Sequence, residues 1–505
     1  MIRQAVRSTP GVWVLVAVLA LFPACAATPS APGTAGVAAV QATKVALEDC
    51  LLSSLAAPES VQARCGTLAV PEDRDDPAGR QIALHIAVVP AVSRNPKPDP
   101  LFLLAGGPGQ AASEAYPAII STAFARIHQD RDIVLVDQRG TGKSNPLQCA
   151  LPEEQDVEQQ VGAWDEEVIA ALQACPGTLD ADPQFYTTDA AVRDLDQVRA
   201  ALGYAQVNLY GASYGTRMAL AYLQRYPGRV RTVVLDGVVS PDFRIYLTAA
   251  SDGTRAMHML FERCRADAAC QEAFPDLQAE FEALLEALAA EPVEVRVADP
   301  VSGEPVAFTM TGERFANMAF ALLYAPEVTS LLPLSVHTAY VGVDFAPLVA
   351  QAMAMDAGLY RGLFYAVACA EDAPFITAGE AAALGEGTYF GDMSRTMRRV
   401  CQAWPRGQLP PDFGTPVSAS VPVLLLSGEA DPITPPEYAG RVAQTLPNSR
   451  HVVVPGMGHG VVTRGCIPNL VADFIAAASV QGLDVACVQA IAPPPFFLRL
   501  TGPEP

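Results

Sequence analysis

The pattern G-x-S-x-G at residues 211–215, centred on Ser213, constrains the fold of this chain more than any other segment. An apolar run at residues 207–210 precedes it and is typical of a strand, while residues 216–226 carry apolar side chains at helical spacing. A serine on a tight turn between strand and helix, with glycines two positions to either side, is typical of a nucleophile lifted above a sheet. The alternative is an ordinary turn whose serine caps the next helix. The flanking strand and helix patterns favour the nucleophile.

A nucleophilic hydroxyl needs a base, and the position of His459 suits that role. The chain has six histidines. His459 follows the strand-like residues 451–454 on a glycine-flanked loop, where its ring is free to turn toward a neighbouring side chain. His85 lies in an alternating strand pattern, and His128 and His258 lie in helix-like stretches. Packing or surface roles suit these three better.

The acid that orients the base is expected on a loop leaving a parallel strand. Asp431 stands on such a loop, after the buried-strand pattern of residues 423–428, and Pro432 stiffens the backbone beside its carboxylate. Its alternative role is to begin a turn before the prolines that follow. Asp236, after the strand-like residues 233–235, is the rival acid, although its Asp-Gly setting also reads as a turn. The position of Asp431 after a buried strand favours it.

The tetrahedral intermediate of acyl transfer needs N–H donors for its oxyanion. One is expected from Tyr214, the residue after Ser213, and the other from the loop after an early strand. Residues 101–104 form that strand pattern and lead into Gly-Gly-Pro-Gly, in which Gly107 is the expected donor. Such a segment in isolation is typical of a tight turn. Its place after a buried strand and before the serine motif favours the oxyanion role.

Strand patterns alternate with helical stretches, which indicates an α/β fold with a mainly parallel sheet. Nearly two hundred residues separate the strands at 230–235 and 423–426, more than one connection in such a sheet needs. We therefore expect a largely helical lid lobe at residues 241–410, inserted before the strand that carries Asp431, with a helical stretch at 257–290 and a hairpin at 293–309. The sheet domain then comprises residues 45–240 and 411–490, and a proline-rich tail occupies 491–505. The remaining strand patterns lie at residues 82–89, 101–104, 133–136, 207–210 and 452–454.

The N-terminus reads as an export signal. Residues 1–7 are basic and residues 11–22 are apolar, the length of a signal peptide rather than of a membrane span. Residues 1–25 resemble a lipoprotein signal. Cleavage of such a signal before Cys25 would leave that cysteine at the new N-terminus, where it would be lipidated. The alternative is an ordinary small-x-small cleavage site around Cys25. Residues 26–44, rich in Ala, Gly, Thr and Pro, suit a flexible tether.

Ten cysteines remain once Cys25 is set aside, and an even number in an exported chain indicates disulfides. The chain has no C-x-x-C motif and no histidine cluster, so no metal and no cofactor are expected. The net charge of −21, from 33 basic and 54 acidic residues, argues against nucleic-acid binding. Pairing of sequence neighbours suggests the disulfides 50 with 65, 149 with 175, 264 with 270, 369 with 401, and 466 with 487.

Four ordered motifs carry a family resemblance: Gly-Gly-Pro-Gly at 106–109, Asp-Gln-Arg-Gly-Thr-Gly-Lys-Ser at 137–144, the serine motif, and Asp431 followed by His459. Together they resemble the prolyl aminopeptidase family of α/β-hydrolase serine peptidases, and most of all its secreted tripeptidyl aminopeptidases. The resemblance covers roughly residues 60–490. It implies an α/β-hydrolase fold and peptide substrates with a free N-terminus. One departure is Ala105, where family members often have His, so any contact made by that imidazole is absent. The oxyanion donor is a backbone group and does not depend on this side chain, whereas the family's substrate preference near this loop does not carry over.

A lid over Ser213 would limit what enters, and a buried N-terminal ammonium would need a carboxylate partner. Glu371 and Asp372 are the candidates for that partner, and the alternative is a solvated acidic pair on a loop. Asp137 and Arg139 are expected to scaffold the oxyanion loop, or else to form an ion pair on a surface turn. The aromatic side chains in the lid could line the pocket or belong to the core: Tyr324, Tyr360, Phe364 and Tyr365.

Two other functions share some of these features. A carboxylesterase or lipase uses the same scaffold and the same three residues, since fold does not decide the acyl substrate. A non-catalytic lipoprotein that binds peptides is the third hypothesis, and it predicts that Ser213 does not react with a fluorophosphonate.

Overall fold

The computed structural model describes residues 44–54, 57–151, 166–298, 303–355 and 358–501. The predicted signal segment, Cys25 and all of the predicted linker except its last residue lie outside the described residues.

Within the described residues, nine strands form one sheet in the order β1-β2-β3-β5-β4-β6-β7-β10-β11. From β5 to β11 all neighbouring strands are parallel, whereas β1, β2 and β3 pair antiparallel with one another and β3 runs antiparallel to β5. The predicted α/β fold with a mainly parallel sheet is confirmed. The strands are β1 (Glu48–Ser54), β2 (Ala57–Pro71), β3 (Gln81–Val89), β4 (Leu101–Leu104), β5 (Ile133–Val136), β6 (Val207–Ala212), β7 (Val230–Asp236), β10 (Val423–Gly428) and β11 (Ser449–Val454).

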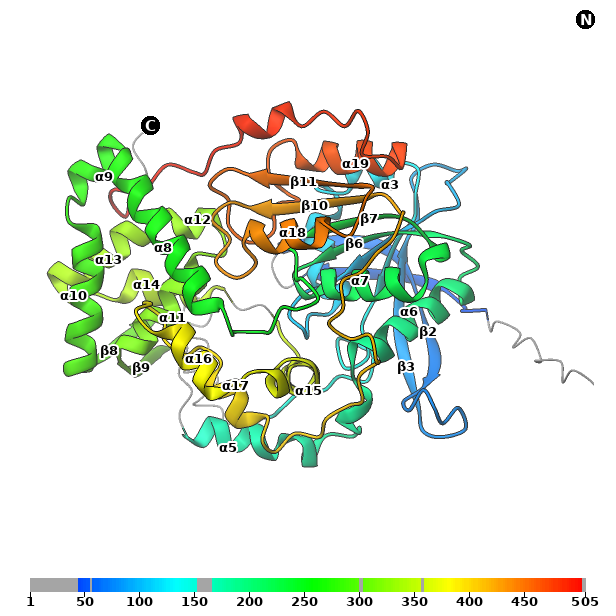
Figure 1. Ribbon diagram of the computed structural model, residues 1–505, viewed down its shortest axis with the longest axis horizontal. Coiled ribbons are helices and arrows are strands. Elements are labelled where there is room, and N and C mark those ends of the chain that lie inside the picture. The colour runs from blue at the N-terminus through cyan, green and yellow to red at the C-terminus, as the bar shows by residue number, and fades with distance from the viewer. Residues whose placement is uncertain (1–43, 55–56, 152–165, 299–302, 356–357, 502–505) are drawn as a thin grey trace, which may run out of the picture. The chain divides into compact units, whose positions relative to one another are not determined.

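The central strands are buried on both faces. Along β4, Leu101 and Leu103 belong to one apolar cluster, and Phe102 and Leu104 belong to the other. This alternation follows from the two-residue period of a strand, and helices on both faces are what a parallel sheet requires. One face carries α6 (Thr188–Ala201), α7 (Tyr214–Arg225) and α18 (Pro436–Ala443), and the other carries α3 (Ala125–His128) and α19 (Ile467–Ala477) (Figure 1).

The residues between β7 and β10, 237–422, are called the inserted segment below. Its hairpin, predicted at 293–309, is confirmed by the antiparallel pair β8 and β9. The helix expected over 257–290 is instead three helices, because Asp267 caps a new helix through Cys270 N–H and Pro275 interrupts the next turn. Figure 1 shows α10, α11, α13 and α14 packed together around this hairpin. The elements are α8 (Ala249–Ala266), α9 (Ala268–Ala273), α10 (Leu277–Ala290), β8 (Val293–Ala298), β9 (Pro305–Met310), α11 (Gly312–Leu322), α12 (Pro326–Thr329), α13 (Leu332–Gly342), α14 (Ala346–Met353), α15 (Arg361–Glu371), α16 (Ala378–Gly385) and α17 (Arg395–Val400).

Short helices complete the described chain. They are α1 (Ala112–Ala115), α2 (Pro117–Ile120), α5 (Glu166–Ala174) and the 3-10 turns η1 (Cys175–Thr178), η2 (Pro183–Phe185), η3 (Pro227–Arg229), η4 (Ala373–Phe375) and η5 (Ala486–Ala490). Within the described ranges, every helix is too short or too polar to cross a bilayer.

Five disulfides join the ten cysteines, and the predicted pairing is confirmed at each of them. The disulfides are Cys50–Cys65, Cys149–Cys175, Cys264–Cys270, Cys369–Cys401 and Cys466–Cys487.

Candidate active site

Ser213 occupies a strained turn between β6 and α7. Its φ of 55° and ψ of −123° lie in a region that residues with a Cβ rarely adopt. A Cβ on Gly211 would lie 2.3 Å from Gly215 O, and a Cβ on Gly215 would lie 2.2 Å from Leu104 O. Glycine at both positions therefore lets the turn close on itself and pack against the end of β4.

His459 and Asp431 form a pair on neighbouring loops. His459 Nδ1 lies 2.8 Å from Asp431 Oδ2, and because a carboxylate only accepts, Nδ1–H is the donor. The other oxygen of Asp431 accepts the backbone N–H groups of Ile433 and Thr434, at 2.9 and 2.8 Å. The Thr434 hydroxyl also donates to Asp431 Oδ2, at 2.8 Å. The carboxylate is thus held in one orientation by groups of its own loop.

The electrostatics of this pair stabilise its charged form. Burial by itself raises the pKa of Asp431, but His459 and the N–H donors of its own loop hold that pKa below its ordinary value. Burial lowers the pKa of His459, but Asp431 and, to a smaller extent, Asp236 raise it above its ordinary value. A proton taken up by His459 is therefore stabilised on the imidazole.

The carboxyl end of β7 connects the serine turn with the histidine loop. Asp236 O accepts the backbone N–H of Ser213 at 2.9 Å. A Cβ on the next residue, Gly237, would lie 2.8 Å from His459 Cε1. Ser213 and His459 therefore both lie against the same strand end, which brings together residues 246 positions apart (459 − 213).

The Asp236 carboxylate contacts the backbone of the histidine loop. It accepts the N–H groups of Val461 and Val462 at 2.9 to 3.0 Å, and Tyr210 donates its hydroxyl at 2.9 Å. Burial raises the pKa of Asp236, and these donors oppose the rise. The rival acid of the sequence thus orients the histidine loop, while the ring of His459 pairs with Asp431.

The Gly-Gly-Pro-Gly loop lies beside Ser213. A Cβ on Gly106 would lie 3.2 Å from Ser213 Cβ, and Gly107 has φ of +103°, a conformation that favours glycine. Tyr214 is buried at the first position of α7, where backbone N–H groups have no partner within the helix. Both predicted oxyanion donors therefore belong to segments that border Ser213.

Asp137 and Arg139 are fully buried, so their interpretation as a surface ion pair is wrong. Asp137 accepts the N–H and hydroxyl of Ser113, each at 2.9 Å, and lies 3.0 Å from His85 Nδ1. Arg139 donates to both oxygens of Asp194, at 2.7 and 2.8 Å. Asp137 thereby anchors the chain just after the Gly-Gly-Pro-Gly loop.

Comparison with known proteins identifies the fold family. A family model described as "alpha/beta hydrolase fold" matches residues 99–462, most of the chain. The chain belongs to this family. The match contains every residue of the site described above except His85, which lies on the antiparallel side of the sheet.

Known relatives of this α/β hydrolase include peptidases. The serine protease Hip1 of Mycobacterium tuberculosis is 35% identical over 193 residues, which cover 36% of this chain and 36% of that protein. This chain therefore matches about a third of the length of the mycobacterial relatives. The tripeptidyl aminopeptidase of Streptomyces coelicolor is 26% identical over 514 residues, which cover 91% of this chain and 89% of that protein. The crystal structure of a serine hydrolase from Cycloclasticus zankles has 16% identity and a TM-score of 0.38, and covers 82% of this chain and 98% of that one.

Glu371 and Asp372 end helix α15 of the hydrolase and are buried, so they are not a solvated loop pair as the alternative interpretation had it. Asp372 accepts two hydrogen bonds from Arg217, at 2.8 and 3.1 Å, and one from Ile245 N–H at 3.2 Å. Glu371 accepts the N–H and hydroxyl of Thr188, at 2.6 and 2.7 Å, and lies 3.3 Å from Arg217 Nη1. The two carboxylates therefore tie the inserted segment to the helix that follows Ser213.

Glu371 also borders a cavity of about 120 Å³. Its polar lining residues include Thr188 and Arg217, and its apolar ones include Leu220 and Phe413. Burial raises the pKa of Glu371, and the charge of Arg217 opposes that rise.

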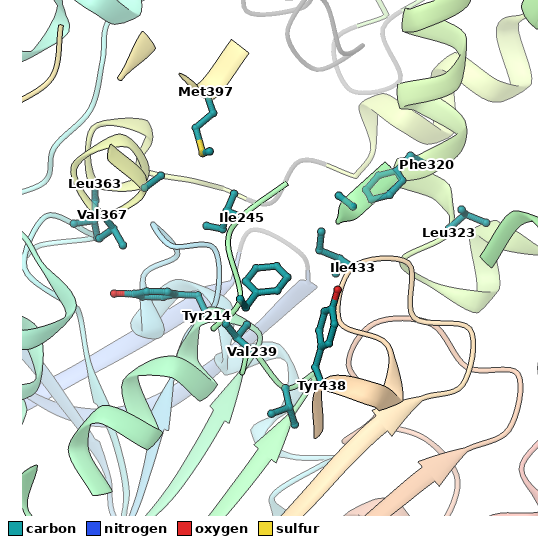
Figure 2. Close-up of a cluster of buried hydrophobic side chains, with 14 of the residues drawn as sticks. Tyr214, Val239, Ile245, Phe320, Leu323, Leu363, Val367, Met397, Ile433 and Tyr438 are labelled. Carbon is teal, nitrogen blue, oxygen red and sulfur yellow. The ribbon is translucent and has the colours of Figure 1, made fainter. Parts of the chain in front are cut away.

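Aromatic residues of the inserted segment contact the loops that border His459 and Ser213. The ring of Tyr324 lies edge-on to the His459 imidazole, with centroids 5.2 Å apart, and Tyr360 N–H donates to Gly109 O at 2.8 Å. Figure 2 shows the apolar cluster at this boundary, in which Ile245 of the inserted segment lies on the side of Tyr214 and Phe320 lies on the side of Ile433. The inserted segment thus contacts the His459 loop, the Gly-Gly-Pro-Gly loop and the apolar side chains around Tyr214.

Three residues of the site have roles that sequence reasoning missed: Asp236, Thr434 and Arg217. Arg217 could have been noticed as a charged residue beside the apolar stripe of the helix after Ser213. The contacts of Asp236 and Thr434 had no such signal. Among the described residues, no group of three His, Cys, Asp or Glu side chains could hold a metal ion.

Proposed function

We propose that this α/β hydrolase is an exported serine aminopeptidase that cleaves peptide bonds near free N-termini. The observation that carries the proposal is the convergence of the strained Ser213 turn and the His459–Asp431 pair at one strand end. The names of the relatives, a serine protease and a tripeptidyl aminopeptidase, support a peptidase over other acyl-transfer enzymes.

The proposed reaction is acyl transfer through Ser213. His459 takes the hydroxyl proton as Ser213 Oγ attacks the scissile carbonyl, and Asp431 stabilises the imidazolium that forms. The N–H groups of Gly107 and Tyr214 hold the oxyanion. His459 then gives its proton to the leaving amine. In the second half of the reaction, water gives a proton to His459 as it attacks the acyl-enzyme, and His459 returns this proton to Ser213 Oγ as the acyl group leaves.

The inserted segment is proposed to act as the lid that restricts entry to short chain ends. Recognition of the substrate ammonium by Glu371 and Asp372 stays a prediction, because both carboxylates are already engaged by Arg217. Glu371 also borders a cavity, but the residues that line this cavity include neither Ser213 nor His459. Glu371→Gln is expected to raise KM for free-amine peptides and to leave KM for blocked substrates unchanged.

Export is supported by the five disulfides, which persist in oxidising compartments. We further propose a lipid on Cys25, which would attach the enzyme to a membrane through the linker at residues 26–44. Cys25→Ser is expected to release the enzyme from the membrane fraction of cells that process lipoproteins. Release of wild type and variant in equal amounts would favour the ordinary cleavage site.

The decisive experiment compares the mature protein with Ser213→Ala on matched chromogenic peptides. The peptides contain one, two or three residues, with free or acetylated N-termini, and a short acyl ester is tested beside them. Serine-dependent cleavage confined to free amines is expected, and the preferred length gives the number of residues released.

Other outcomes identify the alternatives. Cleavage of the ester alone would make the protein an esterase and would leave Glu371 and Asp372 with their structural contacts only. No cleavage, together with no reaction of Ser213 with a fluorophosphonate, would indicate a non-catalytic peptide-binding protein.

A further inference from the structure

Arg255 of helix α8 contacts the loop that carries Asp431. Its Nη2 donates to Asp431 O at 2.7 Å, and its Nη1 donates to Glu429 O at 2.8 Å. One planar guanidinium therefore spans the two carbonyls that flank this turn. Arg255 lies in the inserted segment, 176 residues before Asp431, so the contact comes from outside the sheet domain.

This contact acts on the backbone from which the Asp431 side chain projects. The carboxylate is oriented by N–H groups of its own loop, at residues 433 and 434, so a rotation of the loop would carry the carboxylate with it. A guanidinium presents several N–H donors in a fixed plane, and two bonds from one plane resist such a rotation better than a single bond would.

The inserted segment contacts the His459 loop in a comparable way. Tyr324 O accepts the backbone N–H of His459 at 2.8 Å. A Cβ on Gly458 would lie 2.4 Å from the same oxygen, so the two backbones are in close contact. The Tyr324 ring packs edge-on against the imidazole. The backbone of the Asp431 loop is thus held by the Arg255 side chain, and the backbone of the His459 loop by the Tyr324 carbonyl.

We propose that Arg255 is a positioning residue, which holds the Asp431 loop in the orientation that lets the carboxylate pair with His459. The inserted segment then has a second role beyond restricting entry, because it completes the geometry of the acid and the base. This inference rests on the proposed function, in which His459 and Asp431 act on Ser213.

The test uses Arg255→Met and Arg255→Lys, with Arg263→Met as the matched control. Arg263 lies on the same helix, donates to Pro494 O at 2.8 Å and packs over the Phe496 ring, so it is a comparable arginine away from Asp431. Circular dichroism and thermal unfolding establish that each variant is folded. The first readout is the second-order rate constant for reaction of Ser213 with a fluorophosphonate, which does not depend on the peptide substrate.

Arg255→Met is expected to react about tenfold to a hundredfold more slowly than wild type, since displacements of about 1 Å in catalytic groups have effects of that size. Arg255→Lys retains a donor for the carbonyls and should recover part of the rate. Arg263→Met should react like wild type. A rate for Arg255→Met within about twofold of wild type, or an equal loss in Arg263→Met, would overturn the proposal.

A second readout separates this inference from the proposed function. The pKa of the His459 imidazole is measured by NMR of histidine-labelled protein, with the resonance assigned from His459→Gln. The charged groups that face the ring are Asp431 on the loop after β10 and Asp236 at the end of β7, and Tyr324 and Thr434 are its neutral neighbours. Displacement of Asp431 should lower this pKa in Arg255→Met, whether or not the protein cleaves peptides. An unchanged pKa would overturn the positioning role, whereas failure of wild type to react with the fluorophosphonate would count against the proposed function alone.

Discussion

The carboxylate of Asp236 accepts the backbone N–H of Val461 at 2.9 Å, two residues after His459. The main-chain oxygen of Asp236 accepts the N–H of Ser213. One residue at the end of β7 therefore joins the serine turn to the histidine loop without pairing with the imidazole itself. In the proposed reaction, Asp236 fixes the position of the serine turn relative to the histidine loop.

Asp236→Asn is expected to slow the reaction of Ser213 with a fluorophosphonate by about tenfold to a hundredfold, because a buried N–H acceptor is replaced by an amide that also presents donors. The pairing of His459 with Asp431 should survive, so the imidazole pKa should fall only slightly. Stopped-flow labelling and histidine NMR measure the two effects. A large fall of the pKa would instead make Asp236 the principal electrostatic partner of His459.

The pH dependence of labelling should report His459. The imidazole acts as a base only when neutral, so the rate should rise with pH and level off above its pKa. Because Asp431 raises that pKa, the midpoint should lie above the ordinary value of about 6.5. In Asp431→Asn the rate should fall roughly 10⁴-fold, and the midpoint should move to a lower pH than in wild type, because burial is then opposed only by the smaller effect of Asp236 on the His459 pKa. A midpoint that does not move in this variant would contradict the pairing.

Asp372→Ala should destabilise the fold. Arg217 would lose its closer carboxylate and Ile245 N–H would lose its acceptor. Breaking a buried ion pair from one side costs about 3–5 kcal/mol of unfolding free energy, and we expect the lower end because Glu371 stays at 3.3 Å. Urea unfolding measures the change. Asp473→Ala, which removes the exposed pair with Arg126, is the control and should cost less than about 1 kcal/mol.

Gly458→Ala should displace the histidine loop. The added Cβ would lie 2.4 Å from Tyr324 O and 2.8 Å from Leu323 O, both backbone atoms that cannot move aside alone. We expect labelling of Ser213 to slow by at least about tenfold. Gly440→Ala in α18, where an added Cβ meets nothing within 4 Å, should retain the wild-type rate. Equal rates for both variants would show that the histidine loop tolerates the shift.

Local patterns were sufficient to predict much of the fold and the contact between His459 and Asp431. Ser213, His459 and Asp431 each stand at a strand end marked by an apolar run and by glycine or proline, and strand ends of a parallel sheet meet at one edge. The disulfides were also predictable from local sequence, because each one joins a cysteine to the next cysteine along the chain.

Sequence reasoning failed where the outcome depended on a distant partner. It treated Asp236 as a rival acid and Glu371 and Asp372 as an open question, because a carboxylate's role depends on which donors surround it. Arg217, which donates hydrogen bonds to Asp372, lies 155 positions away from it in the chain. Arg255, which donates to the backbone of the Asp431 loop, lies 176 positions away from Asp431. Strand and helix periods describe which face of an element is buried, and they carry no information about which other element covers that face. Packing of the inserted segment on the sheet and its helices supplies those partners, and so it decides which buried charges bind one another and which hold the loops of Asp431 and His459.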